Sequence, residues 1–197
     1  MKYIAIIFML MFQVLSAQNS PESFWKNKCE FTTDGSGKSL GLKIRVPVPC
    51  AWEQSEGKRP HVVKTFSYGF PDGSSISQSL TVNKLPNSFS KSEINELFSQ
   101  DGLRSMCEGT GTFVSGRRVR IDGLECAEVI ARASRNSPVA TFYAYMLSYY
   151  LIYKDKIVVI GYMTGSISDE DSKELFDTYK EIFQGLATGT IIMTQWE

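Results

Sequence analysis

The residues with the most reactive side chains in this sequence are four cysteines and one histidine. Cys50 follows the segment IRVPVP, and His61 lies a short distance beyond it. A cysteine nucleophile needs a nearby base, so these two residues would form a catalytic dyad only if neighbouring strands brought them together. The segment PCAW does not match the surroundings of thiol hydrolases, and one histidine supplies too few ligands for zinc. We therefore expect no catalytic residue, no enzyme activity, no metal and no cofactor.

The first seventeen residues have the features of a secretory signal peptide. Lys2 precedes an apolar run over residues 3–12, and Ala17 is a small residue at the expected cleavage position. The run is shorter than the about 20 residues that a membrane-spanning helix needs. We expect an exported protein, periplasmic or extracellular, with no transmembrane anchor after residues 1–17 are removed.

All four cysteines, Cys29, Cys50, Cys107 and Cys126, follow this segment. An even number of cysteines in an oxidising compartment predicts two disulfides. Four cysteines allow three pairings. We favour Cys29 with Cys50 and Cys107 with Cys126, because both pairs close short loops.

The charge balance limits the classes of partner. The chain has 21 Lys and Arg against 21 Asp and Glu. Such a balance creates no long-range field that would attract nucleic acid or an anionic membrane. We expect a protein partner in the cell envelope, no nucleic acid, and a monomeric chain.

One candidate binding surface is a cluster of arginines. Its members are Arg117, Arg118, Arg120, Arg132 and Arg135. Such a cluster could hold an anionic glycan, a lipid phosphate or an acidic partner. The alternative is a solvated hairpin whose arginines pair with nearby glutamates.

A second candidate surface is a row of tyrosines. Tyr143, Tyr145, Tyr149 and Tyr153 share one face of an expected strand. Such a row can be a stacking platform for sugars or peptides, or the core of a sheet beneath a helix.

The elements that would position these residues begin with three strands. Alternating apolar residues predict a strand over 42–48 that ends at its prolines. Further strands are expected over 61–68 and 76–83, with a turn at 70–75 between them.

A helix is predicted next, over residues 91–106. Ser90 and Glu93 have the capping-box spacing, and apolar residues recur at helical intervals. Gly102 should weaken or bend the helix before Cys107.

Asp122-Gly123 predicts a tight hairpin turn. With these two residues in the turn, Arg120 faces Glu125 and Arg117 faces Glu128. Two cross-strand pairs of opposite charge in one register favour this assignment.

The last part of the chain predicts two central strands of a sheet and a helix that packs on them. Residues 139–153 and 157–163 are apolar on both strand faces, which is typical of central strands. A helix should begin after Ser168 and carry an apolar stripe as far as Leu186.

The expected order is strands, helix, four strands, helix, with short connections in the second half. Short connections imply antiparallel pairing, so the predicted class is α+β, with a twisted antiparallel sheet flanked by helices. We expect residues 18–41 to form an N-terminal segment with a flexible loop at 32–39, and residues 42–197 to form a single domain.

The motifs KIRVPVPCAW, RIDGLECAEVIAR, KDKIVVIGYMTG and FDTYKEIFQGL, in that order, resemble the PsbP-like fold. The resemblance covers residues 42–192. That fold is shared by the PsbP protein of photosystem II, a Ran-release factor and many small exported bacterial proteins. It implies an α-β-α sandwich, protein binding or assembly assistance, and no shared catalytic residues. The cysteines depart from the family pattern and suggest local stapling.

Our first hypothesis is a non-enzymatic exported domain that binds a protein or assists assembly, through a sheet edge or the 117–135 hairpin. The alternative is a small-molecule or lipid-binding protein of the cell envelope, with its ligand beneath the tyrosine face.

Overall fold

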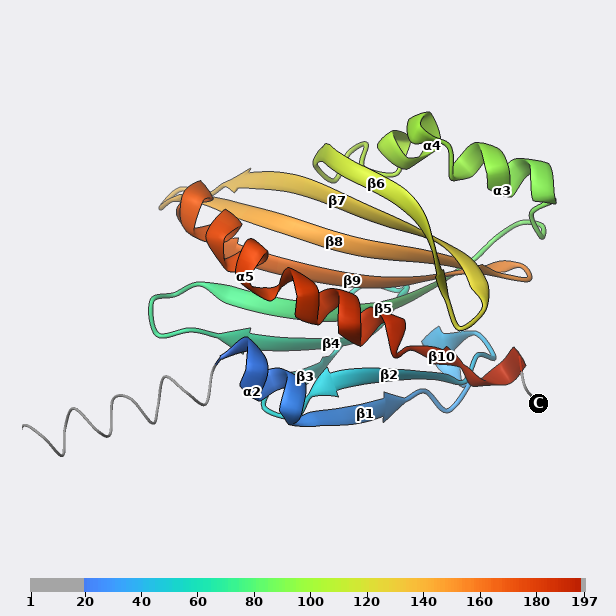
Figure 1. Cartoon of the computed structure of the whole chain (residues 1–197), viewed down its shortest axis with the longest axis horizontal. Helices are drawn as coiled ribbons and strands as arrows, with labels where there is room; N and C mark the ends of the chain where they lie inside the picture. The colour runs from blue at the N-terminus through green and yellow to red at the C-terminus, as the bar shows by residue number, and fades with distance from the viewer. Residues whose placement is uncertain (1–19, 196–197) are drawn as a thin grey trace, which may run out of the picture.

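The structure is a computed structural model that describes residues 20–195, so the expected signal peptide lies outside the described residues. Its central layer is a seven-stranded sheet in the order β3-β4-β5-β9-β8-β7-β6, antiparallel throughout (Figure 1). The strands are β3 (Glu53–Glu56), β4 (Val62–Gly69), β5 (Ser75–Lys84), β6 (Thr112–Ile121), β7 (Leu124–Asn136), β8 (Thr141–Tyr153) and β9 (Lys156–Ser166).

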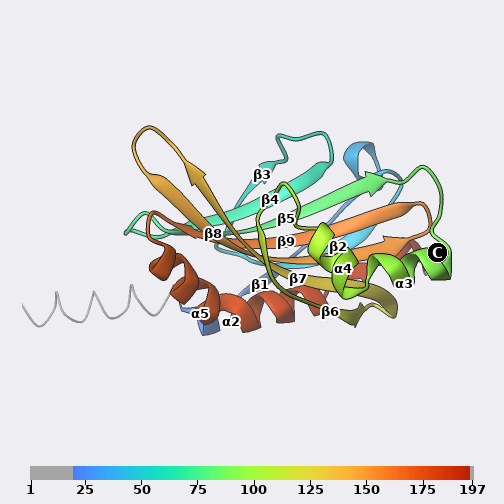
Figure 2. The ribbon, with the colours of Figure 1, turned by 90° about the horizontal axis from the view of Figure 1, so that it is seen from above.

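Helices cover both faces of this sheet. Helix α5 (Asp169–Thr188) lies across one face, where it is joined by α2 (Pro21–Lys26) and a small three-stranded sheet (Figures 1 and 2). The small sheet contains β1 (Lys28–Thr32), β2 (Ile44–Pro49) and β10 (Ile191–Ile192), and short 3-10 turns lie at Gly37–Ser39 and Met193–Gln195. Helices α3 (Lys91–Leu97) and α4 (Gln100–Ser105) pack on the opposite face. The α+β class and the α-β-α sandwich are thereby confirmed.

Strand β8 shows how two cores arise from one sheet. Successive side chains of a strand point to opposite faces. Leu147, Tyr149 and Leu151 therefore join the core under α5, whereas Met146 and Tyr150 join the core under α3 and α4. The apolar character of both strand faces, visible in the sequence, reflects these two separate cores.

Helix α5 forms where its apolar stripe predicts. Ser168 caps it by accepting a hydrogen bond from the Asp171 amide at 3.3 Å. Its buried face includes Phe183, whose ring stacks on Tyr162 of β9 with centroids 5.0 Å apart. Gly189 is the C-terminal cap. The apolar face of this long helix packs on β8 and β9 and forms one hydrophobic core with them.

The predicted hairpin is confirmed in its register. Arg120 lies opposite Glu125 and Arg117 opposite Glu128. Asp122 and Gly123 have positive φ values of 52° and 77°, as a two-residue turn of this handedness requires.

The expected single helix over 91–106 is instead two short helices. The first keeps its capping box at Ser90, but the chain turns at Phe98 and Ser99 begins a second helix by capping the Gly102 amide at 3.2 Å. A Cβ at Gly102 would lie 2.2 Å from the Leu97 carbonyl oxygen. The glycine thus permits a close approach that breaks the helix rather than bending it.

The N-terminal segment is part of the packed structure. Phe24 of α2 is 1% exposed and contacts the rings of Trp52 and Tyr179. Strand β1 pairs with β2 along its whole length, and Cys29 forms the expected disulfide with Cys50. Residues 20–32 therefore contribute a helix and a strand that the sequence pattern did not indicate.

Strand β2 also continues through Pro47 and Pro49, where we expected it to end. Strand β10 pairs only with Ile44 and Arg45. Beyond these two residues one side of β2 is a sheet edge, where a proline without an amide hydrogen is tolerated.

The expected Cys107–Cys126 disulfide is wrong. Both residues are buried free thiols. Cys126 belongs to the core under α5, whereas Cys107 lies at the end of α4 in the core of the opposite face. The sheet separates the two sulfur atoms, and proximity in sequence could not reveal this.

Candidate binding groove between β6 and α5

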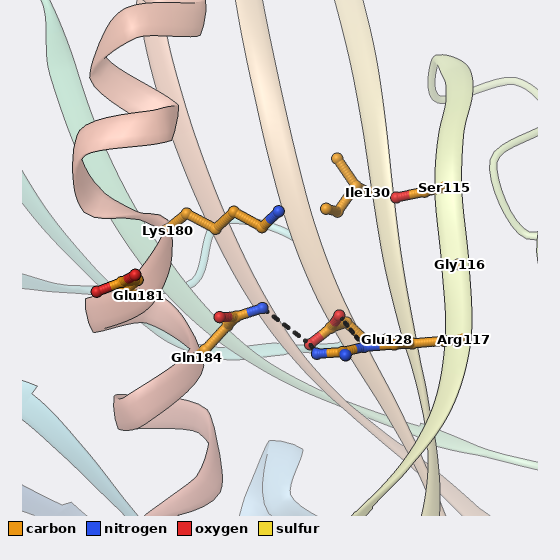
Figure 3. Close-up of a pocket in the computed structure, with 8 residues that line it drawn as sticks. All are labelled: Ser115, Gly116, Arg117, Glu128, Ile130, Lys180, Glu181 and Gln184. Carbon is orange, nitrogen blue, oxygen red and sulfur yellow. Dashed lines mark hydrogen bonds and ion pairs between the residues drawn. The ribbon is translucent and has the colours of Figure 1, made fainter.

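A groove of about 460 Å³ runs between the last strand of the sheet and the long helix (Figure 3). A bulge between Phe113 and Ser115 shifts the register of β6 next to Ser115, which lines this groove. The lining residues are Ser115, Gly116 and Arg117 from β6, Glu128 and Ile130 from β7, and Lys180, Glu181 and Gln184 from α5. We name this site the β6–α5 groove.

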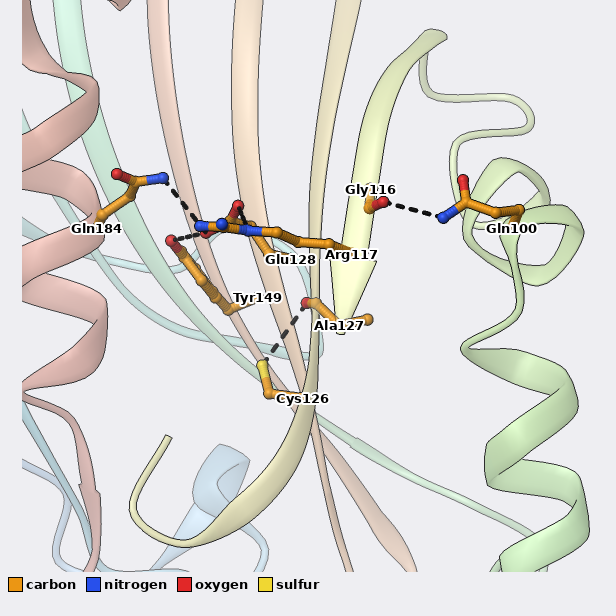
Figure 4. A network of polar contacts seen from close by, with 8 residues as sticks. All are labelled: Gln100, Gly116, Arg117, Cys126, Ala127, Glu128, Tyr149 and Gln184. Atoms are coloured by element: carbon orange, nitrogen blue, oxygen red, sulfur yellow. Dashed lines mark hydrogen bonds and ion pairs between the residues drawn. The ribbon is translucent and has the colours of Figure 1, made fainter. Parts of the chain in front are cut away.

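The groove lining contains the Glu128 carboxylate, which accepts four hydrogen bonds. Figure 4 shows the residues around it. The Glu128 side chain is only 8% exposed. Arg117 donates to it from Nε at 2.7 Å and from Nη2 at 3.3 Å. The Tyr149 hydroxyl donates at 2.6 Å and Gln184 Nε2 at 3.4 Å. Residues from β6, β7, β8 and α5 thus converge on one charged group.

The contacts around Glu128 determine its protonation. Burial alone would raise the pKa of this carboxyl, but the hydrogen bonds and charge of Arg117, with the hydrogen bond from Tyr149, lower it below the usual value. Glu128 is therefore ionised at neutral pH. Its charge in turn raises the pKa of Arg117 through their hydrogen bond.

Two neighbours of Glu128 keep their protons. Burial, followed by the hydrogen bond to Glu128, raises the pKa of the Tyr149 phenol. Burial and the nearby Glu128 charge raise the pKa of the Cys126 thiol. A protonated, buried thiol is a poor nucleophile, so Cys126 is not suited to covalent chemistry. Cys126 fills the core, whereas Tyr149 holds Glu128 through its hydrogen bond.

The structure divides the predicted arginine cluster between different contacts. Only Arg117 enters the groove. Arg118 points to the opposite face, where Nε donates to the Phe98 carbonyl at 3.1 Å and Nη1 to Asn95 at 2.8 Å. Arg132 pairs with Asp169 at the start of α5 at 2.7 Å.

Arg120 lies on the side of β6 away from the groove, opposite Glu125 in register, and both line a shallow depression. Strand alternation, which places neighbouring arginines on opposite faces, therefore disperses the cluster that appears continuous in the sequence.

The predicted tyrosine row lies largely beneath α5. Tyr149 and Tyr153 are buried, and the ring of Tyr145 packs against Phe176 of α5 with centroids 5.8 Å apart. Tyr143 lies 5.9 Å from the guanidinium carbon of Arg132. A ligand could reach most of this row only if α5 moved away.

Of the residues that line the groove, sequence reasoning named only Arg117 and its partner Glu128, so it missed Ser115, Gly116, Ile130, Lys180, Glu181 and Gln184. Lys180 and Gln184 are four residues apart, so they share one side of α5, directly beside the apolar stripe that contains Phe183. That spacing could have identified them as a polar border of the buried face. Their position opposite β6 could not be inferred from it.

The catalytic dyad that we considered loses its nucleophile, because the Cys50 sulfur is bonded to Cys29. Within residues 20–195, no cluster of three His, Cys, Asp or Glu side chains could hold a metal ion. Among the helices of this range, none combines the length and the hydropathy that a membrane span requires.

The fold is a three-layer α+β sandwich. Comparison with solved structures shows which known fold it resembles. The chain is similar to the solution structure of cyanobacterial PsbP (CyanoP) from Synechocystis sp. PCC 6803, with a TM-score of 0.51 and 11% identity over 84% of this chain and 92% of that one. The chain thus has a PsbP-like fold, as its motifs indicated.

The chain is also similar to the crystal structure of the Saccharomyces cerevisiae Ran-binding protein Mog1p, with a TM-score of 0.46 and 15% identity over 84% of this chain and 95% of that one. No family model matches the chain. No curated protein matches it either.

Proposed function

We propose that this protein is a non-enzymatic binding domain that docks a segment of a protein partner in the β6–α5 groove. The observation that carries the proposal is the buried network around Glu128. A buried charge is costly unless it is fully paired, and an apolar pair would often be at least as stable. Here the pair fixes the orientation of Arg117, whose side chain remains 63% exposed at an open groove. An exposed arginine that is held in one orientation is suited to bind a partner, and not only to stabilise the fold.

We further propose that the domain is exported, acts in the periplasm or outside the cell, and assists the assembly of an envelope complex. The Cys29–Cys50 bridge supports export, since both cysteines are exposed and structural disulfides persist in oxidising compartments. The PsbP-like fold is compatible with an accessory role, but a fold does not define a function. The groove carries the argument.

Site-specific photo-cross-linking in the cells that make the protein tests the proposal. A photoreactive residue replaces Val114, which is 51% exposed and adjoins Ser115 of the groove. Leu40, 37% exposed in the loop before β2, is the matched control position. We expect one partner to be captured from position 114 and to bind the purified domain. Equal capture from both positions, or no adduct at native abundance, would contradict the proposal.

A further inference from the structure

The charges of the β6–α5 groove do not cancel. Arg117 and Glu128 neutralise each other. Glu181 belongs to the lining, but its carboxylate points out of the groove in the close-up, while the Lys180 side chain extends across it toward Ile130 (Figure 3). The interior of the groove therefore carries one uncompensated positive charge, that of Lys180.

Lys180 differs from the neighbouring lysine on the same helix. Lys173 forms an ion pair with Asp177 at 2.6 Å. No ion pair involves Lys180 in the described part of the chain. Two lysines of one helix thus offer a matched pair, one engaged by an acidic neighbour and one free to bind a ligand.

Other donors face the same space. Arg117 uses Nε and Nη2 to hold Glu128, which leaves Nη1 for a further acceptor. Ser115 contributes a hydroxyl from β6. Ile130 adds apolar surface to the groove lining, and the exposed Val114 directly precedes Ser115 along β6. A ligand that fits these groups has a carboxylate next to a small apolar group.

We propose, on the basis of the function proposed above, that the groove recognises an extended acidic segment of its partner. An Asp or Glu side chain of that segment would bind Lys180 and Arg117, and an adjacent apolar side chain would contact Ile130 and Val114. A carboxylate carries one negative charge and so matches the single uncompensated positive charge.

The shape of the groove favours a segment of a protein over a small acid. A small-molecule site normally buries about 70–90% of its ligand. This groove is open, and its outer wall is the last strand of the sheet. It suits a chain that passes through it and continues on both sides.

Fluorescence anisotropy with a rhodamine-labelled decapeptide of alternating glutamate and valine tests this inference on the full-length mature protein. The comparison peptides replace glutamate by glutamine or by lysine. We expect binding of the glutamate peptide only, weakening as salt is raised, because exposed charges are screened over about 10 Å at 0.1 M salt.

Variants at the two lysines localise the effect. Lys180→Gln should weaken binding about tenfold, the loss of one charge-assisted contact. Lys180→Arg should preserve it, and the control Lys173→Gln should bind like the wild type. Equal melting temperatures would show that each variant is folded.

Several results would overturn the inference. These are equal binding of the glutamine peptide, unchanged binding by Lys180→Gln, no binding of the glutamate peptide, or displacement of that peptide by an equal concentration of N-acetylglutamate. If Val114 captures a partner but the glutamate peptide does not bind, acid recognition fails while the proposed function stands. If Val114 captures nothing, the proposed function fails whatever the peptides do.

Discussion

The two faces of the seven-stranded sheet are covered in different ways. One face is covered by the 20-residue helix α5 together with α2 and a second sheet. The other is covered over β6, β7 and β8 by α3 and α4, which have seven and six residues. The first core contains stacked aromatic rings and a buried ionised carboxylate, whereas the second consists of small and aliphatic side chains with a few aromatic rings.

This difference separates two tasks. The α5 face joins segments from both ends of the chain into one core, so it should govern global stability. It also holds the β6–α5 groove at its border. The α3–α4 face joins a local part of the chain to the sheet, so it should open more readily. Four predictions on stability test this division, beginning with the largest effect, and a fifth concerns the two buried thiols.

Removing an aromatic ring should cost more on the α5 face. Phe183→Ala deletes a side chain that is 0% exposed and stacks on Tyr162. We expect a loss of about 3–5 kcal/mol in the free energy of unfolding, measured by urea denaturation. Phe98→Ala is the matched change under α3 and α4, and we expect it to cost at least about 1 kcal/mol less, since short helices can relax around a cavity. Equal losses would remove the distinction between the faces.

The disulfide should stabilise the α5 face by restricting the unfolded chain. Cys29 and Cys50 are 21 residues apart, so replacing both by Ser should lower the free energy of unfolding by about 3 kcal/mol. Reductant should lower the stability of the wild type to the same value and should leave the double variant unchanged.

The oxidised wild-type protein also tests whether the other two cysteines are free thiols. Cys107 and Cys126 should react with a thiol reagent only after the oxidised protein is unfolded, because both are buried. A wild type without titratable thiols in denaturant would instead indicate a second disulfide.

Arg117→Gln should produce a pH-dependent loss. Native contacts lower the pKa of Glu128, so its ionised form contributes stability above its unfolded pKa, and this contribution is lost as the pH falls through the folded pKa. Without Arg117, both the hydrogen bonds and the charge by which this residue lowers the pKa of Glu128 are lost, so we expect that pKa to rise. We expect a loss of about 1–3 kcal/mol at pH 7, which shrinks toward pH 4 as the carboxyl becomes protonated.

Urea denaturation at the two pH values measures this change. Arg120→Gln, which faces Glu125 outside the groove, should stay within about 0.5 kcal/mol of the wild type at both. A loss that is independent of pH would show that Arg117 acts through packing and not through the charge of Glu128.

The smallest effect should be local to the α3–α4 face. Ser99→Ala removes the cap of α4, where Ser99 accepts from the Gly102 amide. We expect a cost of about 1 kcal/mol and faster hydrogen exchange of the α4 amides, with no change in α5. Faster exchange throughout α5 would mean that the two faces unfold as one unit.

Local sequence signals predicted much of this fold. The hairpin at Asp122 follows from two turn residues and two pairs of opposite charge, and its register is confirmed. The final helix and the apolar central strands follow from spacing alone. The helix break at Ser99 was missed because a capping serine and a glycine also occur within regular helices, and only the close approach of Gly102 to Leu97 distinguishes the two cases.

The α+β class, the antiparallel pairing within the second half of the chain and the pairing of Arg117 with Glu128 could be predicted from the sequence. These depend on neighbours along the chain or across one short turn. Which face each strand turns toward α5 depends on contacts between distant segments, which the sequence pattern does not contain. That choice separates Cys107 from Cys126, buries Tyr149, and brings Lys180 opposite Ser115. Strand alternation predicts which side chains of a strand share a face. It does not predict which layer packs on that face, because that depends on contacts between distant segments.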